Sequence, residues 1–143
     1  MDGCRSMAQE SMKFSLIRLN NFMRDRTLKG LEGTDLKASF TPVLAALGDT
    51  DGLTVSELSH ITGLDKSNVT RNIQQLSELG YIVKDSRNSP IILTRKGKDA
   101  ADLIMKIQRE AYDELISCLD DDERRMFIGV AAKVFRSIEG KGF

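Results

Sequence analysis

The stretch from Leu53 to Gly97 constrains the fold more than any other, because its hydrophobic period changes along its length. Val55, Leu58 and Ile61 recur every three residues, a spacing that predicts a short helix with one apolar face. Thr54 precedes this helix and Glu57 follows three residues later, which is the pattern of a capping box. The first element is therefore a short helix that begins after Thr54.

A second helix follows, separated from the first by a glycine. Gly63 can adopt the positive φ that ends a helix, Leu64 can return to the core, and Asp65 is a favourable N-cap. The apolar face of the second helix consists of Val69, Ile73 and Leu76. At about 100° per residue, the opposite face is polar. It consists of Ser67, Arg71 and Gln74, flanked by Asn68, Thr70 and Gln75. Side chains of these types read base edges and phosphates, whereas a merely solvated face carries more Glu and Lys.

After Gly80 the period becomes two. Residues 81–84 and 90–93 predict two strands, and the polar residues 85–89 predict the turn between them. Pro90 has no N–H to donate, which fits the start of an edge strand, and Thr94 caps a long helix. Helix, turn, helix and hairpin in this order form a winged helix-turn-helix, a module whose second helix enters the major groove of DNA.

The segments on either side of this module predict long amphipathic helices. The first carries a stripe of Met12, Leu16, Leu19 and Met23, widened by Phe14, Ile17 and Phe22. The helix after Thr94 carries Ala100, Ile104, Ile107, Ala111, Leu115 and Cys118. A last helix, with Asp120 and Glu123 as its capping box, carries Phe127, Val130 or Ala131, Val134 and Ile138. One small module cannot bury so much apolar surface, so we expect a second copy to cover it in a two-fold homodimer.

The expected fold class is mainly α with a small β-wing, a winged helix-turn-helix embedded in a helical dimerisation frame. Residues 1–36 form a dimerisation helix and connection, residues 37–97 the DNA-binding lobe, and residues 98–143 further dimerisation helices. Within the lobe, another helix is expected to run through Leu47. It either begins near Phe40 with Pro42 in its first turn or begins earlier and kinks at Pro42, and we favour the kink.

Charge is unevenly distributed along a chain that is neutral overall, with 21 basic and 21 acidic residues. Residues 64–98 hold seven basic and three acidic residues, whereas residues 99–143 hold seven and ten. Positive charge is therefore concentrated where DNA would bind. No apolar run reaches the length of about 18 residues that suggests a membrane span, and the N-terminus lacks the order of a signal peptide. We expect no membrane partner and a cytoplasmic protein.

Two sets of residues are candidates for contact with double-stranded DNA. In the recognition helix they are Lys66, Ser67, Asn68, Thr70, Arg71, Gln74 and Gln75. In the wing they are Lys84, Ser86, Arg87 and Asn88. Asp85, two residues before Arg87, is expected to hold its guanidinium through a charge-assisted contact.

Five motifs in this order resemble those of the MarR family of transcriptional regulators over essentially the whole chain. They are Leu53-Thr54-x-x-Glu57-Leu58, the run from Gly63 to Arg71, Leu76-x-x-Leu79-Gly80-Tyr81-Ile82, Asp85-x-Arg87, and Leu93-Thr94-x-x-Gly97. The resemblance implies that the terminal helices form the dimer interface. The segment between Gly80 and Asp85 is several residues shorter than the usual wing of this family, so a shallower reach into the minor groove is expected.

We interpret the chain as a sequence-specific transcriptional regulator, and we favour a repressor over an activator. It is expected to bind a pseudo-palindromic operator and to be released from it by a small-molecule effector. A metal- or redox-sensing winged-helix regulator is the alternative. One histidine, His60, cannot build a zinc site, and Cys4 and Cys118 are too isolated for a metal cluster. Cys4 lacks the aromatic surroundings of a peroxide sensor. A third interpretation is a protein-interaction module. No cofactor or metal is expected, and no motif indicates an enzyme.

Overall fold

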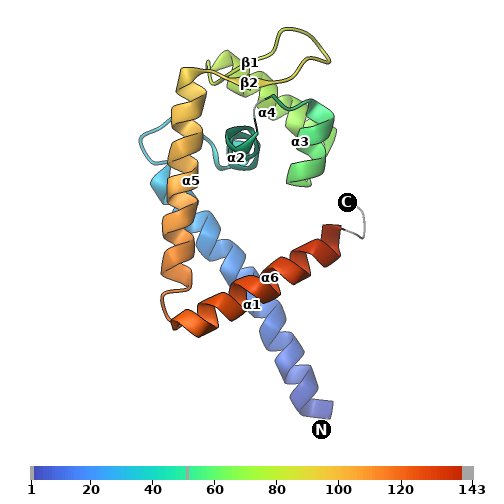
Figure 1. Cartoon of the computed structure of the whole chain (residues 1–143), viewed down its shortest axis with the longest axis vertical. Coiled ribbons are helices and arrows are strands. Elements are labelled where there is room, and N and C mark those ends of the chain that lie inside the picture. The colour runs from blue at the N-terminus through green and yellow to red at the C-terminus, as the bar shows by residue number, and fades with distance from the viewer. Residues whose placement is uncertain (1, 51, 140–143) are drawn as a thin grey trace.

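The computed structural model describes residues 2–50 and 52–139, with side chains described for residues 12–50 and 52–138. Figure 1 shows two helices crossing at one end and a compact lobe at the other, with α5 (Arg95–Leu115) joining them. In chain order the elements are α1 (Asp2–Gly30), a 3₁₀ turn η1 (Ala38–Phe40), α2 (Thr41–Asp49), α3 (Val55–Thr62), α4 (Lys66–Glu78), β1 (Ile82–Val83), β2 (Ile92–Leu93), α5 (Arg95–Leu115) and α6 (Asp121–Glu139). The mostly helical fold with a small antiparallel sheet confirms the predicted fold class.

The core of the lobe forms around α2, which packs against α5 and α3. Phe40, Val43 and Leu44 are completely buried there. Leu58 of α3, Val69 and Leu76 of α4, Ile91 of the hairpin and Ile104 of α5 complete the same core. Each of these elements contributes one apolar face, which is why the lobe packs as a unit.

The predicted helix ends in the helix-turn-helix are confirmed. The Thr54 hydroxyl accepts from the Glu57 N–H at 3.2 Å, and a Glu57 carboxylate oxygen accepts from the Thr54 N–H at 2.8 Å. Gly63 ends α3 with φ 71°, and Asp65 caps α4. The prediction for Ile61 was wrong, because this side chain leaves the apolar face of α3 and is 57% exposed.

The predicted kink at Pro42 was wrong. The α-helix begins at Thr41, so Pro42 lies in the first turn, and the 3₁₀ turn η1 stands immediately before it. A proline in the first turn breaks no helical hydrogen bond, because N–H groups there have no partner within the helix. The chain therefore accommodates Pro42 without bending α2.

The wing is a two-stranded antiparallel hairpin, with Ile82 opposite Leu93 and Val83 opposite Ile92. These strands are shorter than the predicted ones at 81–84 and 90–93. Leu53 adds an isolated antiparallel bridge to Ile91, with N–H···O=C distances of 2.8 and 3.4 Å between the two residues. The sequence analysis did not predict this bridge, which fixes the chain two residues before α3 to the base of the wing.

The helical frame consists of α1, α5 and α6. The guanidinium of Arg26 holds the Glu114 carboxylate at 2.6 and 2.8 Å, which clamps α1 to α5. The stripe along α5 is buried at Ala100, Ile104, Ile107 and Ala111, as predicted, but Cys118 lies beyond the end of the helix and is exposed. The predicted capping box of the last helix is confirmed, since Asp120 and Glu123 exchange bonds of 2.9 and 3.1 Å.

Many apolar side chains of α1 and α6 are open to solvent in the single chain. Phe14, Met126 and Phe135 expose 62%, 69% and 64% of their surfaces. Further exposed members are Met12, Leu16, Ile17, Phe127, Ile128, Val130, Val134 and Ile138. None of the described helices combines the length and the apolar character needed to cross a membrane.

Candidate nucleic-acid interface

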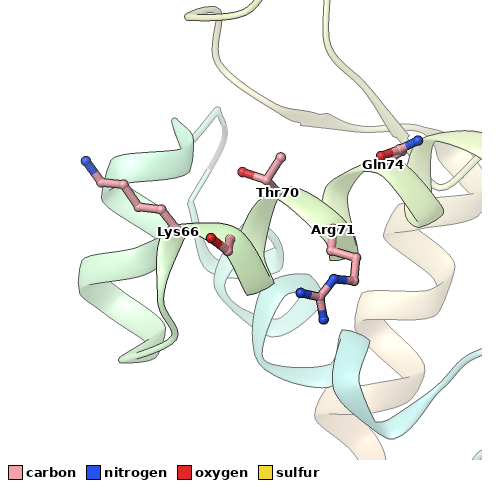
Figure 2. Close-up of a pocket in the computed structure, with 5 residues that line it drawn as sticks. Lys66, Thr70, Arg71 and Gln74 are labelled. Atoms are coloured by element: carbon pink, nitrogen blue, oxygen red, sulfur yellow. The ribbon is translucent and has the colours of Figure 1, made fainter.

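Helix α4 has two sharply different faces. Val69 and Leu76 are completely buried and Ile73 is nearly so. The opposite face is exposed and lines a shallow depression of about 440 Å³, formed by Lys66, Ser67, Thr70, Arg71 and Gln74 (Figure 2). The structure thus brings together five of the seven residues that the sequence analysis assigned to the recognition helix. Two of these side chains are cationic and three are neutral hydrogen-bonding groups, the set that can meet phosphates and base edges at once.

The side chains on this face lie in two rows. Figure 2 shows Lys66, Thr70 and Gln74 along one edge of α4, while Arg71 projects from the other edge. The only polar contact of the Arg71 guanidinium within the described residues is a 3.4 Å bond to the Asn68 carbonyl oxygen. This bond is long, so the guanidinium remains available to an external partner.

Asn68 and Gln75, the other two assigned residues, are half-buried at the margins of this face. The Asn68 side chain donates to the Asp65 carboxylate at 3.1 Å, and Asp65 also accepts from the Asn68 N–H at 2.8 Å. The Gln75 carbonyl oxygen accepts from Lys37 at 3.3 Å. Both amides are therefore engaged within the protein at the two ends of α4.

Two residues that support α4 were missed by the sequence analysis. Asn72 is buried, and its amide donates to the backbone carbonyl of Ser39 at 3.1 Å, which ties α4 to η1. A polar residue inside an apolar stripe is a signal that could have identified Asn72. Lys37, which contacts Gln75 and lies 5.8 Å from the ring centre of Phe40, carries no such signal.

The wing tip is a tight turn closed by a serine. Ser89 donates to the Ser86 carbonyl through its N–H at 3.2 Å and through its hydroxyl at 2.8 Å, and the hydroxyl accepts from the Ser86 N–H at 2.7 Å. Ser86, Arg87 and Asn88 are exposed at this tip, and Lys84 is half-buried. The expected contact between Asp85 and Arg87 was wrong. Within the described residues neither side chain has an ion pair, and the turn is instead closed by the bonds between Ser86 and Ser89.

A cluster of three side chains, Asp35, Tyr81 and Lys96, lies where α4 meets the wing, and we call it the junction. The Tyr81 hydroxyl donates to the Asp35 carboxylate, and the Lys96 ammonium lies 3.6 Å from that carboxylate and 4.3 Å from the Tyr81 ring centre. Burial and the bond to Asp35 raise the pKa of Tyr81 to about 12. The bond from Tyr81, with help from Lys96, lowers the pKa of Asp35. Lys96 is thus held in a defined position beside both Asp35 and Tyr81.

Groups that could bind a metal are not gathered in the described part of the chain. No set of three or more His, Cys, Asp or Glu side chains converges there. His60 is exposed on α3, and Cys118 is a free, exposed thiol. The side chain of Cys4 lies outside the described residues.

A helix-turn-helix with a β-hairpin behind it, and a cationic hydrogen-bonding face on its second helix, define the winged helix-turn-helix class of nucleic-acid-binding folds. Residues 34–89 match the MarR family. The curated HTH-type transcriptional regulator YdgJ from Bacillus subtilis, described as uncharacterised, is 26% identical over 110 residues. That alignment covers 73% of this chain and 67% of YdgJ, or about two thirds of its length.

Solved structures of MarR proteins have a fold similar to that of this chain. A MarR transcriptional regulator from Methanosarcina mazei Go1 has a TM-score of 0.80 and 28% identity, covering 90% of this chain and 96% of the other. A MarR family protein from Mycobacterium tuberculosis, solved in complex with DNA, has a TM-score of 0.70 and 19% identity, covering 85% and 95%. The latter protein has also been solved with salicylic acid. Residues 34–89 and the overall fold are therefore similar to the MarR family of transcriptional regulators, which is a family of regulators and not of enzymes.

Proposed function

We propose that this protein is a sequence-specific transcriptional regulator that binds duplex DNA by inserting α4 into the major groove. The observation that carries this proposal is the exposed face of α4, where Lys66, Ser67, Thr70, Arg71 and Gln74 surround one shallow depression. An α-helix fits the major groove, and only there do all four base pairs present distinct donor and acceptor patterns. The DNA complex of the Mycobacterium tuberculosis relative supports the proposal.

The side chains on α4 would act differently. Arg71 would pair with a guanine or a phosphate, since its planar guanidinium can donate two parallel bonds. Ser67, Thr70 and Gln74 would bond to base edges or to the backbone beside them. Lys66, at the start of α4, would contact a phosphate, where its charge adds affinity but no sequence preference. Asn68 and Gln75 would act mainly by fixing the ends of the helix.

The wing would contact the minor groove beside the recognition helix. Ser86, Arg87 and Asn88 stand at its exposed tip, and Lys84 lies on the approach to it. An arginine in a narrow minor groove responds to the negative potential and to the groove width more than to base identity. The wing would therefore contribute affinity, while α4 contributes most of the sequence preference.

The apolar faces of α1 and α6 support a homodimer. Exposed Phe14, Met126 and Phe135 would be costly to leave in water, and a second copy of the same helices can bury them by two-fold symmetry. Two recognition helices related by that symmetry would read a pseudo-palindrome whose half-sites lie about one helical turn apart. A dimer bound over a promoter would block transcription, which makes repression the proposed outcome.

A small-molecule effector would release the dimer from DNA by favouring another arrangement of the two lobes. The salicylic acid complex of the Mycobacterium tuberculosis relative supports an effector of modest size. Adding salicylate to the protein–DNA complex is a first probe, and release at micromolar to millimolar concentration is the expected result.

Selection from a library of random duplexes tests the proposed function. The protein should enrich a pseudo-palindromic sequence, and binding to it should be tighter than binding to scrambled duplex and should weaken as salt rises. Recovery of no preferred sequence, with salt-independent binding or none, would instead favour a protein-interaction module.

A further inference from the structure

We propose that the junction of Asp35, Tyr81 and Lys96 positions the wing relative to the recognition helix, so that both can engage the same DNA site. These would be positioning residues, which need not touch DNA themselves. The inference rests on the proposed function, because it concerns how the DNA-binding elements are aligned.

The segment between α4 and the wing is only three residues long, Leu79 to Tyr81, and α5 holds it from one side. The Lys96 ammonium donates to the Leu79 carbonyl at 2.7 Å, and the Thr94 hydroxyl donates to the Gly80 carbonyl at 2.7 Å. The Thr94 N–H donates to the Tyr81 carbonyl at 3.0 Å. The first turn of α5 thus binds three successive carbonyls that follow the recognition helix.

The backbone of this segment is closely packed against the first turn of α5. A Cβ atom at Gly97 would lie 1.9 Å from the Tyr81 carbonyl oxygen, so the backbone of Tyr81 rests directly against α5. Gly80 takes a positive φ of 84°, which lets the chain turn sharply out of α4 and into β1.

Asp35 holds the same segment from the other side. It lies in the connection that leads from α1 to the lobe, and it accepts the hydroxyl bond of Tyr81, a residue that is only 5% exposed. Lys96 then lies beside both partners, 3.6 Å from the Asp35 carboxylate and 4.3 Å from the Tyr81 ring centre. The junction therefore joins the frame, the end of α4, the start of the wing and the start of α5 at one point.

Alignment of this kind matters for specific binding and much less for random DNA. Full affinity for a preferred site requires the base contacts of α4 and the groove contacts of the wing at the same time, whereas random DNA is held mainly by charge, which depends little on precise alignment. If a loosened junction leaves the aligned arrangement populated about one tenth of the time, the affinity for the preferred site falls about tenfold.

Tyr81→Phe is the sharpest test, because it removes one hydroxyl and keeps the ring beside Lys96. On a duplex selected by the wild-type protein we expect about tenfold weaker binding. Affinity for random duplex and the dependence of affinity on salt should stay unchanged, since no cation is lost. Tyr112→Phe is the matched control, because its hydroxyl has no hydrogen bond within the described residues and lies on α5.

Asp35→Ala provides a second variant and completes a double-mutant cycle. If the two side chains act as one unit, the double variant should bind the selected duplex no more weakly than either single variant. Denaturant unfolding of each variant gives its folded fraction, which scales the affinities for selected and random DNA by the same factor.

Equal losses on selected and random DNA, or no loss on either, would overturn the inference and leave the junction as a stabilising contact only. That outcome differs from failure of the proposed function, in which the wild-type protein itself would prefer no sequence.

Discussion

Arg87 stands at the tip of the wing with no ion pair within the described residues, so its charge is available to DNA. Arg87→Ala should weaken binding to selected and random duplexes by a similar factor and lower the salt slope by about one phosphate equivalent. Because the wing strands have only two residues each, we expect a smaller loss than from Arg71→Ala. Affinities measured across a salt series on both duplexes provide the check. If Arg87→Ala changes neither the affinity nor the salt slope, the tip of the wing does not contribute to DNA binding.

Glu114 provides a pH-dependent test of the frame. The bidentate bond from Arg26 lowers its pKa from the ordinary 4.5, so the pair stabilises the folded state above that value and loses this contribution as the pH falls through the lower folded pKa. The unfolding free energy of Glu114→Gln should therefore fall less than that of the wild type as the pH is lowered from neutral to acid. Unfolding free energies from pH 7 to pH 3 measure this, with Glu110→Gln as control. Identical acid sensitivity in Glu114→Gln and the wild type would refute it.

At the scale of elements, the contact between α5 and the segment after α4 predicts a strict requirement for glycine at position 97. Gly97→Ala would place a methyl group 1.9 Å from a backbone oxygen, and α5 must shift to relieve the clash. We expect a loss of about 1–3 kcal/mol in unfolding free energy, as in other overpacked sites. Lys98→Ala, exposed in the same turn, should change it by less than about 0.5 kcal/mol. Equal unfolding free energies for the two variants would contradict the requirement for glycine, because α5 would then have shifted at little energetic cost.

Elements whose ends depend on neighbouring residues could be predicted from the sequence. Thr54 with Glu57, Asp65 with Asn68 and Thr94 with Gly97 are caps closed over three residues, so their partners are visible in the chain. The polar face of α4 was predictable for the same reason, because helical period alone places Arg71 opposite Val69 and Leu76.

Contacts between distant residues could not be predicted. Asp35 lies 46 residues from Tyr81, and Ser39 lies 33 from Asn72, and no local pattern indicates either pair. The bridge between Leu53 and Ile91 is equally remote. Ile61 shows a different limit, since a spacing that suits an apolar face does not guarantee that another element covers the last turn.

At the scale of the whole molecule, the uncovered faces of α1 and α6 predict a dimer. Light scattering of the wild-type protein should give twice the chain mass of 15.9 kDa at micromolar concentration. Val134→Asp puts a charge into the exposed apolar face of α6 and should shift the mass toward the monomer. Arg109→Asp, on the exposed side of α5, is the control. A monomeric wild type that binds a single half-site would contradict the dimer.

The measurement that tests the central claim most directly is the affinity of Arg71→Ala for the duplex that the wild-type protein selects. Arg71 projects from the exposed face of α4 with one long bond to Asn68, so its loss should leave the fold intact. We predict a loss of about 1–3 kcal/mol in binding free energy, with Arg109→Ala unchanged. A folded Arg71→Ala variant that binds the selected duplex as tightly as the wild type would contradict the assignment of α4 as the DNA-reading helix.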